Sequence, residues 1–222
     1  MGPQRIKAVV FDFDGTLAVL NIDFSLMRER VFDLIRAFGV REDAIRESYL
    51  LEIIDEVFLM IQKENPSGAN RFFEMAHHIL RDIEVKAAEE GRLIPGCEKT
   101  LNMLRQKGIK IGIITRNCEE AVRKVFPDID DYCDAFISRD SVENVKPHPD
   151  HLKAMLRALG VSHRDSIMVG DHLIDIQAGK SAGMMTIGVL TGRITRTEFE
   201  KAKADFILKD ISEIDPLLKE DV

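Results

Sequence analysis

The chain has 222 residues, of which 45% are hydrophobic, and this composition excludes a wholly disordered protein. Its 31 Lys and Arg residues against 38 Asp and Glu residues give a formal net charge of −7, so it lacks the basic surface of a nucleic-acid-binding protein. No apolar run approaches the roughly 20 residues of a membrane helix. Asp12 also interrupts the apolar start too early for a signal peptide.

Cysteine usage agrees with an intracellular protein. Cys97, Cys118 and Cys133 are odd in number, lie far apart and form no CxxC pair. This spacing fits neither a disulfide framework nor a zinc site, and it predicts free thiols in a reducing compartment. We therefore expect a cytoplasmic protein that binds neither nucleic acid nor membrane.

Short apolar runs alternate with helical patterns along most of the chain. The expected strands are 6–12, 109–115, 134–138, 166–170, 185–190 and 205–208, and the expected helices between them are 97–107, 117–126, 149–159 and 173–183. This alternation predicts an α/β fold in which helices cover both faces of a parallel, Rossmann-like, doubly wound sheet.

Residues 17–92 break this alternation. They contain no strand pattern and predict three helices, near 24–38, 42–64 and 69–90, with a break at 65–68 before the third. A helical block between the first two strands of a sheet is an insertion. We expect a Rossmann-like core of residues 1–16 and 93–222 and an all-helical cap of residues 17–92.

The sequence Asp12-Phe13-Asp14-Gly15-Thr16 follows the first expected strand. Ligands of open α/β sheets bind at the carboxyl ends of the strands, so one of these carboxylates can serve as a nucleophile and the other as an acid or base. The plainer interpretation is an Asp-Gly turn with solvated acids, and from this motif alone the two interpretations are about equal.

A second acidic motif, Gly170-Asp171-His172-Leu173-Ile174-Asp175, follows the expected strand 166–170. Asp171 and Asp175 can share a helix face if Asp171 lies near the first turn, although a helix start also favours acids without any function. Several carboxylates at one edge of a sheet would repel each other without a cation. Their hard oxygen atoms suit Mg²⁺.

Two further features are weak when taken singly. Lys146, before Pro147, can neutralise a nucleophilic carboxylate and a phosphate, although a lone Lys is more often a surface residue. Thr115-Arg116-Asn117, at the end of the expected strand 109–115, can cradle a phosphate or simply cap a helix.

The chain resembles the phosphatase branch of the haloacid dehalogenase superfamily in four motifs and in their order. These are DFDGT, a Thr that closes a later strand, a Lys before Pro, and GDxxxD. The resemblance covers about residues 5–16 and 93–210. The position of the helical insertion resembles the C1-type cap of that family, and the nearest likeness is to phosphoglycolate phosphatases.

The resemblance implies roles for three catalytic residues. Asp12 would take up the phosphoryl group as an aspartyl phosphate. Asp14 would be the general acid for the leaving alcohol and then the general base for water, and it would lend its main-chain oxygen to Mg²⁺. Lys146 would hold Asp12 and the phosphate.

The resemblance also implies the binding residues. Thr115 would bind phosphate oxygen with help from the N–H of Arg116 or Asn117. Asp171 would ligate the metal, and Asp175 would be a ligand or a partner that orients the ligands. The implied metal set is Asp12, Asp14, Asp171 and Asp175.

The predicted function is therefore a Mg²⁺-dependent phosphatase of small phosphorylated metabolites such as phosphoglycolate or a sugar phosphate, working as a monomer or homodimer. One alternative is a phosphomutase, which in the β-phosphoglucomutase pattern typically has Val where this chain has Thr16. A less favoured one is a non-catalytic metabolite-binding or regulatory module. His172 lies within the acidic motif without a predicted role, and no pattern draws attention to His151.

Overall fold

The computed structural model describes residues 6–218. Its main sheet has six parallel strands in the order β5-β4-β1-β6-β7-β8. The strands are β1 (Ala8–Asp12), β4 (Lys110–Ile114), β5 (Ala135–Ile137), β6 (Ser166–Gly170), β7 (Met185–Val189) and β8 (Phe206–Leu208). The predicted α/β class with a doubly wound parallel sheet is confirmed, and each strand lies within its expected range.

Strand β1 lies at the centre of the sheet, where successive connections turn in opposite directions. All five of its residues are buried, which explains why its sequence is a continuous apolar run rather than an alternating one. Asp12 pairs with Ile114 of β4, and Phe11 pairs with Val169 of β6. The residues that follow β1, β4 and β6 therefore meet at one edge of the sheet.

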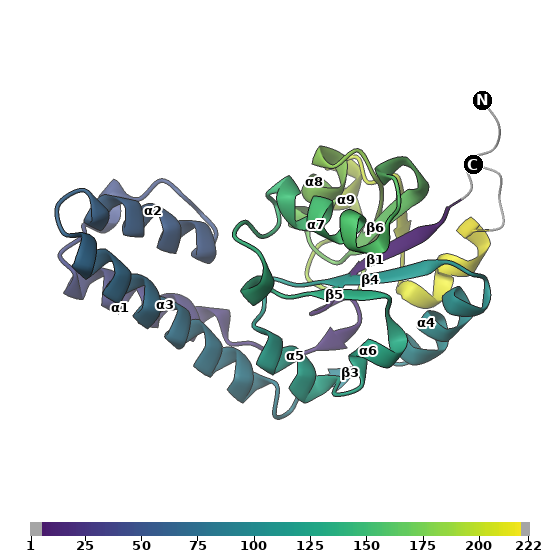
Figure 1. Ribbon diagram of the computed structural model, residues 1–222, viewed down its shortest axis with the longest axis horizontal. Helices are drawn as coiled ribbons and strands as arrows, with labels where there is room; N and C mark the ends of the chain where they lie inside the picture. Colours follow the sequence, from purple (N-terminus) through teal and green to yellow (C-terminus); the bar gives the residue numbers. More distant parts are fainter. Residues whose placement is uncertain (1–5, 219–222) are drawn as a thin grey trace. The chain divides into compact units, whose positions relative to one another are not determined.

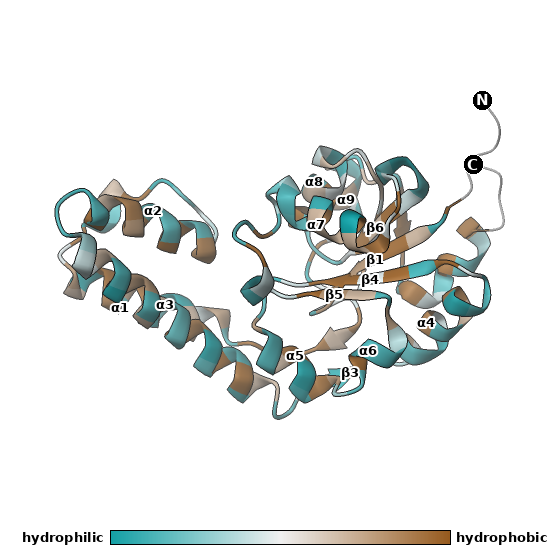
Figure 2. Ribbon diagram, viewed as in Figure 1, coloured by the Kyte–Doolittle hydropathy of each residue, from teal (hydrophilic) through white to brown (hydrophobic). Residues whose placement is uncertain are grey.

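Helices cover both faces of this sheet (Figure 1). On one face lie α7 (Pro149–Leu159), α8 (Leu173–Ser181) and α9 (Arg196–Lys201), and on the other lie α4 (Cys97–Gln106), α5 (Glu119–Val125) and α6 (Ile129–Tyr132). Leu152, Met155 and Leu159 of α7 pack with Val10 and Met168 of the sheet in one buried cluster. Figure 2 shows that the strands of the sheet are largely apolar and that the helices around it carry both apolar and polar residues.

The described chain divides into two compact units. Residues 21–87 form the smaller unit, which contains α1 (Phe24–Ala37), a 3₁₀ turn (Glu42–Ala44), α2 (Leu50–Gln62) and α3 (Pro66–Ala87). Its core is made where α3 packs on α1 and α2, with Val31, Ile54 and Phe72 fully buried. Within residues 6–218, no helix combines the length and the apolar character that crossing a membrane requires.

The expected bounds of two helices in residues 17–92 were wrong. The helix expected over 42–64 is interrupted at 45–49, where Glu56 Oε2 accepts hydrogen bonds from the main-chain N–H groups of Arg46 and Glu47 (2.9 and 3.0 Å). The third helix begins at Pro66, three residues before its expected start. Proline suits the first turn of a helix, and the Asn65 side chain caps it by accepting from Gly68 N–H (2.9 Å).

The expectation that residues 17–92 contain no strand was also wrong. Strand β2 (Ala18–Val19) pairs antiparallel with β3 (Arg92–Leu93), and Ile94 N–H donates to the Leu17 carbonyl (2.8 Å). This short ribbon joins the two ends of the insertion within the larger unit. It is too short to produce an alternating pattern in the sequence.

Candidate active site

Asp12 ends β1, and a tight turn carries the chain away from the sheet. The N–H groups of Thr16, Leu17 and Ala18 all donate to the Phe13 carbonyl (2.9–3.3 Å). Gly15 has a φ of 87°, and a Cβ atom there would lie 2.3 Å from Asp171 Oδ2. Glycine is therefore required both by the turn and by the close approach of the second acidic motif.

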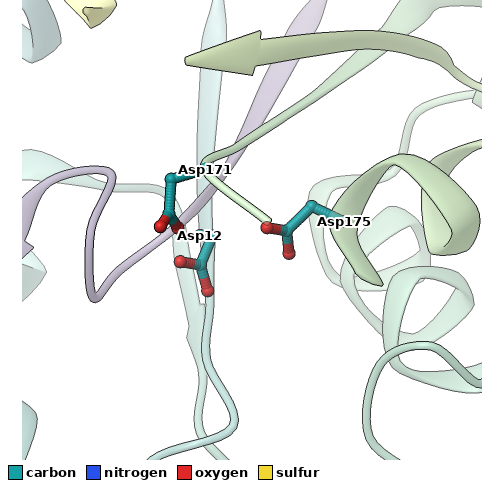
Figure 3. A group of neighbouring side chains, drawn as sticks. All are labelled: Asp12, Asp171 and Asp175. Carbon is teal, nitrogen blue, oxygen red and sulfur yellow. The ribbon is translucent and has the colours of Figure 1, made fainter. Parts of the chain in front are cut away.

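Three carboxylates converge at this edge of the sheet (Figure 3). Asp12 comes from β1, Asp171 from the loop after β6 and Asp175 from α8, and one oxygen of each lies within 4.8 Å of the others. The condition under which Asp171 and Asp175 could share a helix face is not met, because Asp171 precedes α8, which begins at Leu173 with His172 as its N-cap. The loop itself brings the two acids together.

Lys146 is the buried cation of this site. Its Nζ donates to Asp12 Oδ1 (2.5 Å) and to Asp175 Oδ1 (2.7 Å), and its side chain is only 1% exposed. Burial opposes the charge on the ammonium, but the two carboxylates outweigh it and raise the pKa of Lys146 above its ordinary value. The lysine therefore stays charged and fixes the position of Asp12.

The carboxylates carry more negative charge than Lys146 balances. Burial, with the negative charge of neighbouring acids, raises the pKa of Asp12 to about 7 and that of Asp171 to about 8. Hard oxygen donors held close together in a partly dry site suit a divalent cation. The donor set therefore fits the cation that the sequence implied.

Asp14 and Thr16 line the same turn. Asp14 Oδ1 accepts from Leu20 N–H (2.9 Å), and the Asp14 carboxylate is close enough to help raise the pKa of Asp12 and of Asp171. The fully buried Thr16 hydroxyl lies 3.5 Å from Asp12 Oδ2 and 3.4 Å from Asp171 Oδ1. Thr16 is thus a polar contact of the site for which the sequence predicted no chemical role.

The Thr115-Arg116-Asn117 loop follows β4, beside Asp12. The helix expected from 117 begins only at Glu119, so these three residues form a turn and not a helix start. Asn117 N–H donates to Thr115 Oγ1 (3.1 Å), and the Arg116 guanidinium donates to the Lys146 carbonyl. The Asn117 side-chain amide is buried, and among residues 6–218 its Nδ2 has no hydrogen-bond acceptor.

Two histidines support the site. His172 caps α8 by accepting from Ile174 N–H (3.2 Å), while Asp175 Oδ2 accepts from His172 N–H (3.1 Å). His151, fully buried on α7, accepts from Lys146 N–H through Nδ1 (3.3 Å). No sequence pattern points to His151, since it is a single residue inside an amphipathic helix.

Comparison with known proteins connects this arrangement with a family. The family model described as haloacid dehalogenase-like hydrolase matches residues 9–189. Among curated proteins, pyrophosphatase PpaX of Bacillus cereus (strain AH820) is 28% identical over 220 residues, a match that covers 98% of each chain.

Solved structures show the same relationship. A HAD phosphatase from Thermococcus onnurineus is 28% identical with a TM-score of 0.62, covering 98% of this chain and 100% of its own. A predicted phosphoglycolate phosphatase from Haemophilus somnus 129PT has a TM-score of 0.65 at 19% identity, with coverage of 96% and 98%. The second of these shows a likeness of fold alone.

Proposed function

This chain belongs to the haloacid dehalogenase-like hydrolase family, and from that membership and its site we propose that it is a Mg²⁺-dependent phosphatase of small phosphorylated metabolites. The predicted family and hydrolase class are confirmed, and relatives named as phosphatases and pyrophosphatases support the phosphatase class. We also propose its substrate class and the roles of its site residues.

One observation carries the proposal. Lys146 Nζ lies between Asp12 and Asp175 (2.5 and 2.7 Å), beside a third carboxylate, Asp171, at the carboxyl edge of the sheet. Phosphoryl transfer requires a positioned nucleophile and neutralisation of charge above all. A carboxylate held by one buried lysine, next to two further acids, meets both requirements.

In the proposed reaction, a carboxylate oxygen of Asp12 attacks phosphorus and the bond from phosphorus to the leaving oxygen breaks. Asp14, as a carboxylic acid, gives its proton to that oxygen. Water then attacks the aspartyl phosphate and Asp14 takes up its proton. The bond from phosphorus to Asp12 breaks, and inorganic phosphate and the free Asp12 carboxylate result.

The Thr115 loop is proposed to hold the phosphate oxygens. Thr115 follows the residue that pairs with Asp12 and is therefore adjacent to the nucleophile. Asn117 N–H already donates to Thr115 Oγ1, which leaves the Thr115 hydroxyl hydrogen available to a phosphate oxygen. A buried N–H group without an acceptor lowers stability by about 1–3 kcal/mol. A phosphate oxygen at this loop would give Asn117 Nδ2 the acceptor that it lacks among residues 6–218.

Asp12, Asp171 and the main-chain oxygen of Asp14 are the proposed ligands of Mg²⁺. The bound cation supplies neutralisation of the charge on the transferring phosphoryl group. Asp175 lies in the same cluster, but both of its oxygens already accept hydrogen bonds, from Lys146 and from His172 N–H. Those bonds favour a role for Asp175 in orienting Lys146.

Divalent cations are expected to stabilise the fold more at about pH 8 than at about pH 5.5. The raised pKa values of Asp12 and Asp171 mean that the folded chain keeps protons which the unfolded chain loses above about pH 4. Without metal, their contribution to stability is present at low pH and disappears as pH rises to about 8. Mg²⁺ binds ionised carboxylates, so its stabilisation of the fold is largest at about pH 8, where the metal-free protein is least stable.

Thermal melts with Mg²⁺ and with a chelator, at both pH values, measure this difference. Asp171→Asn is the matched variant, because it removes one of the two acids with raised pKa and should reduce the Mg²⁺ effect at about pH 8. An increase in Tm that is equal at both pH values, or absent at both, would contradict the proposed metal site.

Phosphate release from a panel of compounds tests the proposed function. The panel contains phosphoglycolate, sugar phosphates, nucleotides and an aryl phosphate, each with Mg²⁺ and with a chelator. Pyrophosphate belongs in it as a second candidate, because the relative matched over 98% of its length is named a pyrophosphatase. We expect chelator-sensitive release with one clear preference. No release from any compound by the folded, Mg²⁺-binding protein would overturn the proposal.

We also propose that the helical unit is the cap that selects the substrate. The structure gives this unit as residues 21–87, within the range 17–92 expected from the sequence. The shared phosphoryl-transfer residues all lie in the larger unit, so they act on the phosphoryl group whatever the rest of the substrate is. A choice among leaving groups then requires residues outside that set. Grafting the helical unit of a relative with a different preference tests this, and an unchanged preference would contradict it.

A further inference from the structure

His151 makes two hydrogen bonds that join separate parts of the site. Its Nδ1 accepts from the main-chain N–H of Lys146 (3.3 Å), and its Nε2 lies 3.2 Å from the carbonyl oxygen of Ile137. The same Ile137 carbonyl also accepts from Thr115 N–H (3.2 Å). One imidazole thus connects the lysine that holds the nucleophile with the strand end that holds the phosphate loop.

The environment fixes the form of this imidazole. His151 is fully buried, and burial, together with the nearby Lys146 charge, lowers the pKa of His151 to about 3. The ring is therefore neutral at all working pH values. Because Nδ1 accepts from Lys146 N–H, the ring proton lies on Nε2 and is donated to Ile137.

The main chain of Lys146 is held on its other side as well. Its carbonyl accepts from the Arg116 guanidinium, while its ammonium reaches Asp12 and Asp175. The lysine side chain is long and flexible, so a fixed backbone narrows the positions that its ammonium can take up on Asp12. A displacement of about 1 Å at a reacting group can cost about 100-fold in rate.

We propose that His151 is a positioning residue for the phosphoryl-transfer reaction: it fixes the Lys146 backbone against Ile137, so that the lysine ammonium remains on Asp12. This inference rests on the proposed function, because it assigns His151 an effect on the chemical step. It does not require that His151 touch the substrate or exchange a proton.

Three substitutions separate positioning from packing. His151→Asn keeps an acceptor near the Nδ1 position but cannot reach Ile137, whereas His151→Gln reaches Ile137 but loses the acceptor for Lys146. His151→Leu loses both hydrogen bonds and keeps the apolar bulk. His163→Asn, at an exposed histidine of the same sheet-bearing unit, is the control. Each variant is measured for kcat, KM, Tm and hydrogen exchange at the Lys146 amide.

We expect His151→Leu and His151→Gln to lower kcat by about 10- to 100-fold with little change in KM, and to exchange the Lys146 amide faster. His151→Asn keeps the acceptor for Lys146 without the anchor on Ile137, so it should recover only part of kcat and of the amide protection. His163→Asn should match the wild type, and full recovery by His151→Asn would show that the bond to Ile137 has no positioning role. Values of kcat that follow Tm alone, or equal recovery by Asn and Gln, would overturn the inference.

The amide measurement also separates this inference from the proposed function. If the wild type released no phosphate from any compound, the proposed function would fail while exchange at Lys146 could still be compared among the variants. Unchanged exchange in His151→Leu would overturn the inference whatever the activity.

Discussion

Replacement of Asp12 by Asn is expected to abolish turnover, by roughly 10⁴-fold or more, while the fold is retained. The amide cannot form the aspartyl phosphate. The fold should survive because Asn has the same shape, Lys146 keeps its bond to Asp175 (2.7 Å), and the substitution removes a buried acid whose raised pKa reflects an unfavourable charge. Steady-state kinetics on the preferred substrate and a thermal melt measure both effects.

Asp14→Asn is the matched control for this prediction. An aryl phosphate has a leaving group that needs no proton, so Asp14→Asn should release a stoichiometric burst of the aryl alcohol and then turn over slowly. Asp12→Asn should give no burst. A burst from Asp12→Asn, or retained turnover in that variant, would show that another residue is the nucleophile.

Replacement of Lys146 by Met is expected to reduce both turnover and stability. Without the ammonium, Asp12 and Asp175 become buried carboxylates with no countercharge from this residue, and breaking such a buried pair costs about 3–5 kcal/mol. Turnover should fall by roughly 10²- to 10³-fold, since the nucleophile and the phosphate lose a preorganised charge. Urea unfolding at about pH 8 and the same kinetic measurements test these expectations.

The loss of stability should be smaller at about pH 5, because Asp12, whose pKa is raised to about 7 by burial, is then protonated and no longer needs a countercharge. Lys153→Met is the matched control: Lys153 lies on α7, is exposed and pairs with Asp150 at the surface (3.3 Å). Its free energy of unfolding should change by less than about 0.5 kcal/mol. An equal loss in both variants would contradict the role given to Lys146.

Much of the fold could be predicted because its strands are buried on both faces. Such strands are continuous apolar runs, and β6 was predicted over its full range. The break at 45–49 could not be predicted, because it depends on a contact with the Glu56 side chain about ten residues further along. The short helices α6 and α9 were missed for a related reason, since they have too few residues to show an apolar period.

The site was predictable where its residues follow strands. Asp12, Thr115 and Asp171 each come at or just after the end of a central strand, and a parallel sheet brings such positions together. Lys146 lies in the loop after β5 and not at a strand end. From its residues alone, a surface Lys was the commoner interpretation, and its place beside Asp12 was expected from the family resemblance. Its bond to Asp175 and its support by His151 depend on how α7 and α8 pack, which no sequence pattern records.

Trapping the covalent intermediate tests whether Asp12 is the nucleophile. The enzyme is mixed with its preferred substrate and Mg²⁺, quenched and treated with borohydride, which reduces an aspartyl phosphate to homoserine, and its peptides are then analysed by mass spectrometry. We expect homoserine at position 12, and none there when the substrate is omitted. Homoserine at position 14 of the wild type would contradict this assignment of the nucleophile. The same would follow if Asp14→Asn, which should accumulate the intermediate, gave no homoserine at position 12.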